Sequence, residues 1–187
     1  MSRTQPIAKT APEGLELATL AGGCFWCLEP AFAELKGVLD VECGYAGSDY
    51  ANANYEAVCT GNTGLAEVIH ILFDPQIISY ETLLQIFFVL HDPTTLNRQG
   101  NDIGTQYRSA IFTHHAAQNL TAQSMKNWVE QAIEQPVTTQ IEAFNPAQYT
   151  RAEEYHQDYY KKNPIRYGYY RHGCGRDDRL KELWGQK

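Results

Sequence analysis

The sequence has no long hydrophobic run and no excess of positive charge. Its longest apolar stretch, LLQIFFVL, is too short to span a bilayer. The 187 residues carry a formal net charge of −7, whereas proteins that mainly bind nucleic acids or anionic membranes need a basic surface. We therefore expect neither nucleic acid nor membrane binding as the main function.

Cysteine is scarce, and its number is odd. An odd set of cysteines argues against a disulfide framework and leaves burial, metal binding or redox catalysis as their roles. The N-terminal stretch MSRTQPIAKTAPEG lacks the apolar middle of a secretory signal. We therefore expect a cytoplasmic protein. The five cysteines are Cys24, Cys27, Cys43, Cys59 and Cys174.

The chain also lacks internal repeats and linkers rich in proline, glycine or serine, which indicates a single domain. Apolar alternation predicts strands at 15–22, 38–47, 55–59, 66–74, 105–114 and 138–144. Helical spacing predicts helices at 24–36, 79–92, 116–135 and 151–162. This order does not alternate regularly enough for a doubly wound sheet. It indicates an α+β domain with a mixed or antiparallel central sheet, helices packed on it and a ferredoxin-like core.

The stretch AGGCFWCLEPAF places Cys24 where a helix begins. Free backbone N–H groups and the positive end of the helix dipole stabilise a thiolate there, and the thiolate is the nucleophilic form. Gly22 and Gly23 leave room for a substrate to approach. Phe25 and Trp26 are too bulky for both to enter one core, so at least one is expected to line an apolar pocket. The pattern favours nucleophilic or redox chemistry, with burial or metal binding of the Cys-X-X-Cys pair as alternatives.

Several motifs together resemble the A-type peptide methionine sulfoxide reductases. They are GGCFWCLEPAF, GYAGS, YEAVCTGNTGLAEVIHILFDP, ISYETLLQIFFVLHDPTTLNRQGNDIGTQYRSAIF and EEYHQDYYKKNP, in family order from about Leu17 to Pro164. The resemblance implies an enzyme that reduces methionine S-sulfoxide, free or in proteins, and so repairs oxidised proteins. We expect a flexible lead-in at 1–14, the catalytic domain at 15–164, and an irregular C-terminal arm at 165–187.

The resemblance assigns a residue to each group that the reaction needs. Cys24 is expected to attack the sulfoxide sulfur and become a sulfenic acid. Glu67 is expected to protonate the oxide oxygen, for which burial must keep it protonated near neutral pH. By local sequence alone, Glu67 also fits an exposed strand end. The substrate-binding residues are expected to be Phe25 and Trp26 at the methyl group, Tyr55 and Tyr107 at the oxygen, and Asp102 ordering the site.

The sequence leaves open which cysteine removes the sulfenic acid. Cys174 stands between glycines in the C-terminal arm, where a mobile thiol could reach Cys24, and we favour it. Cys27 is the local alternative, because a Cys-X-X-Cys pair at a helix start closes readily. Cys43 and Cys59 lie in strand patterns and are expected to be buried and inert. By the resemblance, thioredoxin reduces the resulting disulfide; we expect a monomer that needs no metal or organic cofactor.

Three positions depart from the family pattern. Leu65 replaces a histidine, Ser48 a glycine, and Ala53-Asn54 a Pro-Thr pair. No reacting group is lost. Leu65 and Asn54 are nevertheless expected to change the hydrogen bonding of their loop.

Two other functions compete with this interpretation. One is a general dithiol–disulfide oxidoreductase built on Cys24 and Cys27, although the chain lacks a thioredoxin-like βαβ start. The other is a zinc-binding interaction module. Its ligands would be Cys24, Cys27, His172 and Cys174.

Overall fold

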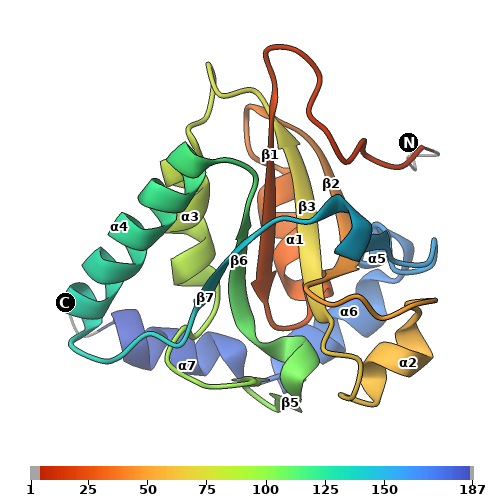
Figure 1. The fold of residues 1–187 in the computed structure, drawn as a ribbon. Helices are drawn as coiled ribbons and strands as arrows, with labels where there is room; N and C mark the ends of the chain where they lie inside the picture. Colours follow the sequence, from red (N-terminus) through yellow and green to blue (C-terminus); the bar gives the residue numbers. More distant parts are fainter. Residues whose placement is uncertain (1–4, 186–187) are drawn as a thin grey trace.

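The computed structural model describes residues 5–185, which form one six-stranded sheet with helices packed on it (Figure 1). The strand order is β7-β6-β1-β3-β2-β8. The β6–β7 pair is parallel and the other pairs of this sheet are antiparallel, which confirms the predicted α+β fold with a mixed sheet. The strands are β1 (Glu16–Gly22), β2 (Val38–Ala46), β3 (Ala66–Phe73), β6 (Ser109–Thr113), β7 (Gln140–Ala143) and β8 (Thr150–Arg151).

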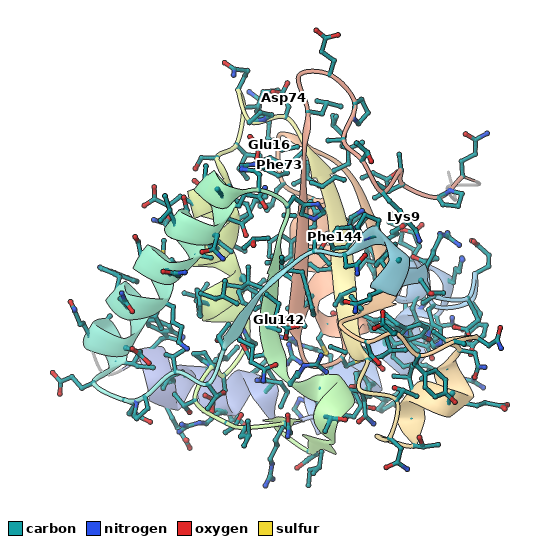
Figure 2. All side chains as sticks on the ribbon, viewed as in Figure 1. Lys9, Glu16, Phe73, Asp74, Glu142 and Phe144 are labelled. Carbon is teal, nitrogen blue, oxygen red and sulfur yellow. The ribbon has the colours of Figure 1, made fainter. Side chains whose placement is uncertain are left out.

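The four middle strands, β6-β1-β3-β2, form the ferredoxin-like core. Helix α1 (Phe25–Ala33) connects β1 to β2, and α3 (Tyr80–Leu90) connects β3 to β6. Strands β1 and β3 pair from Glu16 opposite Phe73, two residues that lie together in Figure 2. Alternate residues of β3, among them Ile69, join the main core with α1 and α3, whereas Val68 joins a smaller cluster on the opposite face.

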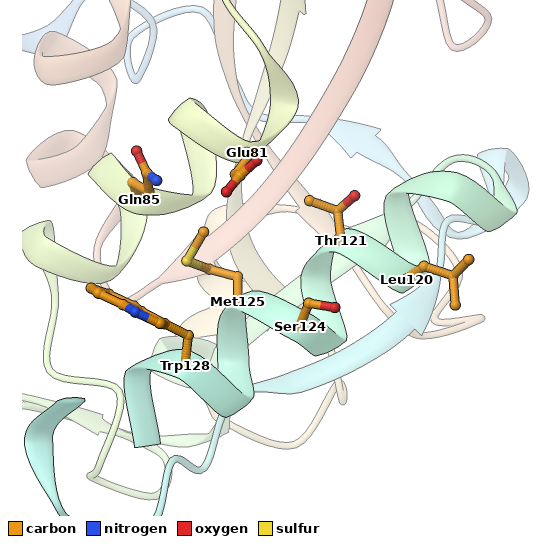
Figure 3. A pocket seen from close by; sticks show the side chains of 7 residues that line it. All are labelled: Glu81, Gln85, Leu120, Thr121, Ser124, Met125 and Trp128. Atoms are coloured by element: carbon orange, nitrogen blue, oxygen red, sulfur yellow. The ribbon is translucent and has the colours of Figure 1, made fainter. Parts of the chain in front are cut away.

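Helix α4 (Ala116–Ile133) follows β6 and packs on α3. A groove lies between the two helices, and Figure 3 shows the side chains that line it, with Trp128 57% exposed. None of the predicted site residues lines this groove. None of the helices in the described part of the chain is long and apolar enough to cross a membrane.

The strand predicted at 55–59 is wrong, because these residues form helix α2 (Tyr55–Cys59). The Asn54 side chain accepts a hydrogen bond from the Ala57 amide at 3.0 Å and so acts as the helix N-cap. The departure at Asn54 from the family pattern therefore supports a helix whose first residue is Tyr55.

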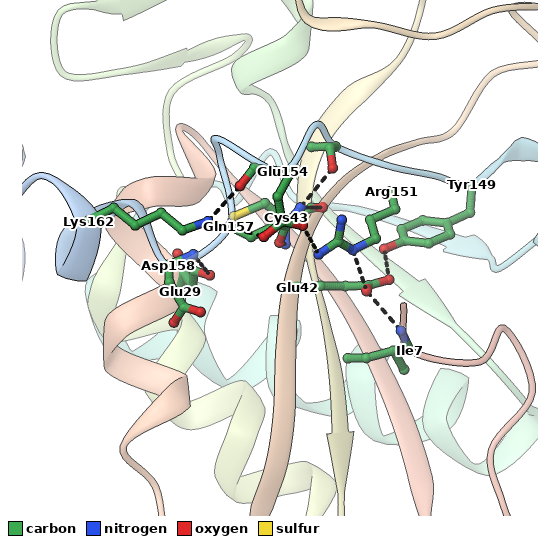
Figure 4. A network of polar contacts seen from close by, with 11 residues as sticks. Ile7, Glu29, Glu42, Cys43, Tyr149, Arg151, Glu154, Gln157, Asp158 and Lys162 are labelled. Carbon is green, nitrogen blue, oxygen red and sulfur yellow. Dashed lines mark hydrogen bonds and ion pairs between the residues drawn. The ribbon is translucent and has the colours of Figure 1, made fainter. Parts of the chain in front are cut away.

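The helix predicted at 151–162 is mostly wrong. Only its end is helical, as α5 (Tyr159–Lys162), while its first residue belongs to β8. The Gln157 side chain bonds both backbone groups of Cys43 on β2, at 2.8 and 2.9 Å, and so holds this segment along the sheet edge (Figure 4). Asp158 then takes a left-handed conformation, with φ of 52°, which interrupts any helix that would begin earlier.

Residues 7–9 of the predicted lead-in contact the body of the domain, and residues 1–4 lie outside the described part. The Ile7 amide donates to Glu42 at 2.9 Å, and Ile7 itself is buried. The Lys9 ammonium donates to the carbonyls of Pro146 and Tyr149, both at 2.8 Å. These contacts fasten the lead-in to β2 and to the loop before β8.

The predicted irregular C-terminal arm is also wrong where it is described. It forms α6 (Pro164–Gly173) and α7 (Arg176–Trp184), which run past the lower ends of α3 and the sheet in Figure 1. Both helices bury few side chains, so their sequences lack the apolar period from which helices are predicted. Arg179 of α7 bonds Asp92, just after α3, at 2.6 Å and fastens the arm to the body.

Candidate active site

A turn between β1 and α1 carries Cys24. Gly23 has a left-handed φ of +85°, and a Cβ atom there would lie 2.5 Å from both Arg176 Nη2 and Gln99 Cγ. Glycine is needed here because the C-terminal arm and the β4–β5 hairpin (Arg98–Gln99 with Asp102–Ile103) press against the turn. Cys24 follows as the N-cap of α1 and is only 5% exposed.

Glu67 of β3 lies on the helix side of the sheet, beside this turn. Its carboxyl accepts a hydrogen bond from the Phe25 amide, the first residue of α1, at 3.1 Å. The side chain is buried, and burial raises its pKa to about 8, more than the hydrogen bond from Phe25 lowers it. Glu67 is therefore protonated at neutral pH, in hydrogen-bond contact with the Cys24 thiol.

The Cys24 thiol is neutral in the resting site. Burial raises its pKa, a hydrogen bond with Cys27 lowers it, and the neighbouring Glu67 carboxyl raises it, with a net increase. The position at the helix start therefore does not by itself ionise this thiol, because burial and the neighbouring carboxyls raise its pKa. Any thiolate must form during the reaction.

The other polar residues expected at the site gather around the same point. Tyr107 ends the 3-10 helix η1 (Thr105–Tyr107), and Tyr55 begins α2. Burial raises the pKa of both hydroxyls, and the proximity of Glu67 raises it further, so both stay protonated and can donate hydrogen bonds. Asp102 on β5 accepts a hydrogen bond from the Tyr170 hydroxyl of α6 at 2.6 Å.

Phe25 and Trp26 take different places. Phe25 is 1% exposed and belongs to the core, where its ring lies 5.0 Å from His156. Trp26 is half-buried and stacks on Tyr159 at 3.9 Å, with Tyr170 edge-on at 5.6 Å. The apolar surface beside Cys24 is thus formed by Trp26 and tyrosines of the C-terminal part of the chain.

The sequence motifs indicate no role for Tyr159 or Tyr170, and no role in the chemistry for His156. His156 is fully buried among the rings of Phe25, Trp26 and Tyr55. Glu153, three residues earlier, accepts the Tyr55 amide at 2.8 Å, so one segment orders both α2 and the aromatic cluster. The twelve tyrosines were the available signal, but tyrosine content alone does not show which rings meet.

Three of the five cysteines form a row, with Cys27 in the middle. A hydrogen bond with Cys174 lowers the pKa of Cys27, while a hydrogen bond with Cys24 and burial raise it, to about 11. The contact with Cys27 and burial raise the pKa of Cys174. Of the remaining two, Cys43 is buried, but Cys59 is exposed at the end of α2, contrary to expectation.

The residues of the zinc hypothesis do not gather into a site. Cys24, Cys27 and Cys174 are buried together, whereas His172 is exposed on α6. Within residues 5–185 no group of three or more histidines, cysteines, aspartates and glutamates is arranged to hold a metal ion.

The site combines a buried thiol, a protonated carboxyl in contact with it and two tyrosine hydroxyls. These groups supply the nucleophile, the acid and the hydrogen-bond donors that a thiol-based reductase needs. The family model described as peptide methionine sulfoxide reductase matches residues 16–187. The chain belongs to the peptide methionine sulfoxide reductase family, as its motifs predicted.

Individual relatives agree with this assignment. Peptide methionine sulfoxide reductase MsrA of Saccharolobus solfataricus is 51% identical over 149 residues, which are 80% of this chain and 83% of the relative. The crystal structure of reduced Mxr1 from Saccharomyces cerevisiae matches with a TM-score of 0.79 and 36% identity, covering 84% of this chain and 90% of Mxr1. Mxr1 in complex with Trx2 matches with a TM-score of 0.59 and 26% identity, covering 79% and 87%.

Proposed function

We propose that this enzyme reduces methionine S-sulfoxide to methionine with Cys24 as nucleophile and Glu67 as acid. Reduction of methionine sulfoxide follows from the family; the two roles rest on one observation. A carboxyl with a pKa of about 8 is buried in hydrogen-bond contact with a thiol. It can hold a proton at neutral pH until the sulfoxide oxygen, otherwise a poor leaving group, needs it.

The first step joins the Cys24 sulfur to the sulfoxide sulfur. Glu67 gives its proton to the oxide oxygen, and the Cys24 thiol proton passes to the resulting carboxylate. When the oxygen has moved to Cys24, the products are methionine and a Cys24 sulfenic acid. Tyr55 and Tyr107 donate hydrogen bonds to the oxygen as charge develops, while Trp26 contacts the methyl group.

Resolution of the sulfenic acid follows the row of cysteines. The Cys27 sulfur attacks Cys24, releasing water and forming a Cys24–Cys27 disulfide. The Cys174 thiolate then attacks Cys27, forming a Cys27–Cys174 disulfide and freeing Cys24 for a second sulfoxide. The contacts of Cys27 with both other thiols support this order, in which Cys174 acts second, not as the direct resolving cysteine that the sequence favoured.

Thioredoxin closes the cycle by reducing the second disulfide. Support comes from the relative Mxr1, which forms a complex with Trx2. The same dependence on reduced thiols fits a cytoplasmic location, and we propose that the enzyme works as a monomer. Cell fractionation and sedimentation of the purified protein test these two points.

The deciding experiment counts methionine per enzyme when reduced protein meets each sulfoxide epimer without added reductant. With three thiols, the enzyme should form two equivalents of methionine from the S epimer. Cys24 accepts the first oxygen before Cys174 attacks Cys27, and the second after that attack has freed Cys24. Cys174→Ser should stop at one equivalent with a Cys24–Cys27 disulfide. Cys27→Ser should stop at one with a sulfenic acid that dimedone traps.

The outcomes separate the alternatives. A Cys24–Cys174 disulfide that forms quickly in Cys27→Ser would make Cys174 the direct resolving cysteine. Absence of methionine from both epimers would reject the reductase mechanism and leave a general dithiol oxidoreductase, which should also tolerate Glu67→Gln.

A further inference from the structure

Arg176 is a buried cation that has no counterion among the described residues. It begins α7, is 2% exposed and is among the largest fully buried side chains of the described chain. In the described part of the chain its Nε and Nη2 have no hydrogen-bond partner, and Nη1 bonds only the Leu90 carbonyl, at 3.4 Å. Within residues 5–185 no carboxylate forms an ion pair with it. Such burial is costly unless an anion is available.

The guanidinium lies directly against the turn that carries the catalytic thiol. A Cβ atom on Gly23 would lie 2.5 Å from Nη2, so the group fills the space that glycine leaves. A backbone hydrogen bond holds the arm in this position: the Asn101 amide donates to the Cys174 carbonyl at 3.0 Å. Arg176 therefore has a fixed place beside the row of cysteines.

Two of its neighbours, Cys27 and Cys174, are thiols that become negatively charged only during turnover in the proposed relay. The Arg176 amide donates to the Cys174 sulfur, and the charge of Arg176 lowers the pKa of both Cys27 and Cys174. Glu67 on β3, His91 after α3 and Tyr167 on α6 also face it. Arg171, which contacts Cys27 as well, already has a counterion in Asp177.

We propose that Arg176 is a positioning residue for the thiol exchange, with a guanidinium that stabilises the Cys174 thiolate as it attacks Cys27. This inference rests on the proposed cysteine relay. In the step, a Cys174–Cys27 bond forms, the Cys27–Cys24 bond breaks, and the electron pair leaves on Cys24, which takes up the proton that Cys174 released. No external oxidant or reductant takes part, and the rate follows the thiolate fraction of the attacking sulfur.

The experiment follows both methionine equivalents over time, with methionine S-sulfoxide and no added reductant, for wild type, Arg176→Met and Arg176→Lys. In Arg176→Met the first equivalent should still form. The second should appear about tenfold more slowly at pH 7, since a thiol pKa higher by about one pH unit leaves a tenth of the thiolate. The deficit should shrink towards pH 9, and Arg176→Lys should recover most of the rate.

Arg166→Met is the matched control, because it removes an exposed arginine from α6 of the same arm; it should behave like wild type. Arg176→Gln removes the same charge with a polar side chain and replaces the Met variant if that fails to fold. A wild-type rate for the second equivalent in the neutral variants would overturn the proposal. The proposal would also be overturned if the rate of the second equivalent fell by the same factor at every pH and fell equally in Arg176→Lys. Failure of wild type to produce the first equivalent would instead reject the proposed function.

Discussion

Glu67 and Cys24 are ionisable side chains that the fold removes from water. Burial raises both pKa values, so at neutral pH the acid holds its proton and the nucleophile is a thiol. The two groups are in contact, and a proton can pass between them without crossing solvent. Their shared environment makes the activity and the stability of the enzyme depend on pH.

The rate of the first methionine equivalent should fall as pH rises through about 8, because Glu67 loses the proton that the oxide oxygen must receive. Glu67→Gln should lower this rate by roughly 10²- to 10⁴-fold and remove the decline. Single-turnover rates between pH 6 and 9.5 measure both effects. A variant that keeps the same decline would place the acid elsewhere.

The same substitution should stabilise the protein at high pH. The pKa of Glu67 rises from 4.5 to about 8 on folding, so between these values the native state holds a proton that the unfolded chain releases. Wild type therefore loses unfolding free energy through this window, by at most about 1.4 kcal/mol per pH unit.

Urea unfolding at pH 5 and pH 8 should show that the free energy of unfolding of Glu67→Gln increases relative to that of wild type as pH rises. The expected increase is on the order of a few kcal/mol. Other titrating groups cancel in the difference between the two proteins. A constant difference would mean that Glu67 is ionised in the native state.

At the scale of elements, the turn between β1 and α1 and the cap of α2 place the reacting groups. Gly23 takes a backbone conformation that other residues adopt with strain, and no side chain fits between it and Arg176. Asn54 holds the first turn of α2 and with it Tyr55. Gly23 and Asn54 thus set the backbone positions of the reacting residues that directly follow them, Cys24 and Tyr55.

Gly23→Ala should destabilise the protein by about 2–3 kcal/mol, because the added Cβ meets both a positive φ and atoms at 2.5 Å. Gly168→Ala is the matched control in α6, where nothing lies within 4 Å of the added carbon. It should stabilise α6 by about 0.5–1 kcal/mol. Denaturant unfolding of both variants tests the contrast; equal effects would contradict it.

At the scale of the whole molecule, the C-terminal arm completes the site. It brings Tyr170, Cys174 and Arg176 to a turn more than a hundred residues earlier in the chain. The arm is held against the body by hydrogen bonds of Asn101 and Tyr170, by the ion pair of Arg179 with Asp92, and by the buried side chain of Leu183, which belongs to the main core.

Asp92→Asn should loosen α7 without disturbing the sheet. The Asp92 side chain is 4% exposed and its partner Arg179 36% exposed, so solvent screening limits the expected loss to about 1 kcal/mol. Hydrogen exchange should accelerate in residues 176–184 and stay unchanged in β1 and β3. Asp178→Asn is the control: it breaks an ion pair of the same helix, and both side chains of that pair are largely exposed. It should change hydrogen exchange neither in residues 176–184 nor in β1 and β3.

Helices and strands with a clear apolar period were predictable from sequence, including the strands of the core and helices α1, α3 and α4. Errors fell where individual polar contacts, local or tertiary, replace that period. α2 depends on an N-cap, Gln157 holds a run of turns against β2, and α6 and α7 expose most of their surface. In each case a few polar contacts, not a repeated apolar face, decide the conformation.

The sequence by itself determined the family and a candidate residue for each chemical task, because a cysteine at a helix start and its accompanying motifs are local patterns. Only the tertiary structure decided the ionisation of Cys24 and Glu67, the order of Cys24, Cys27 and Cys174, and the place of Arg176. These properties depend on burial and on contacts between residues far apart in the chain, for which local sequence carries no signal.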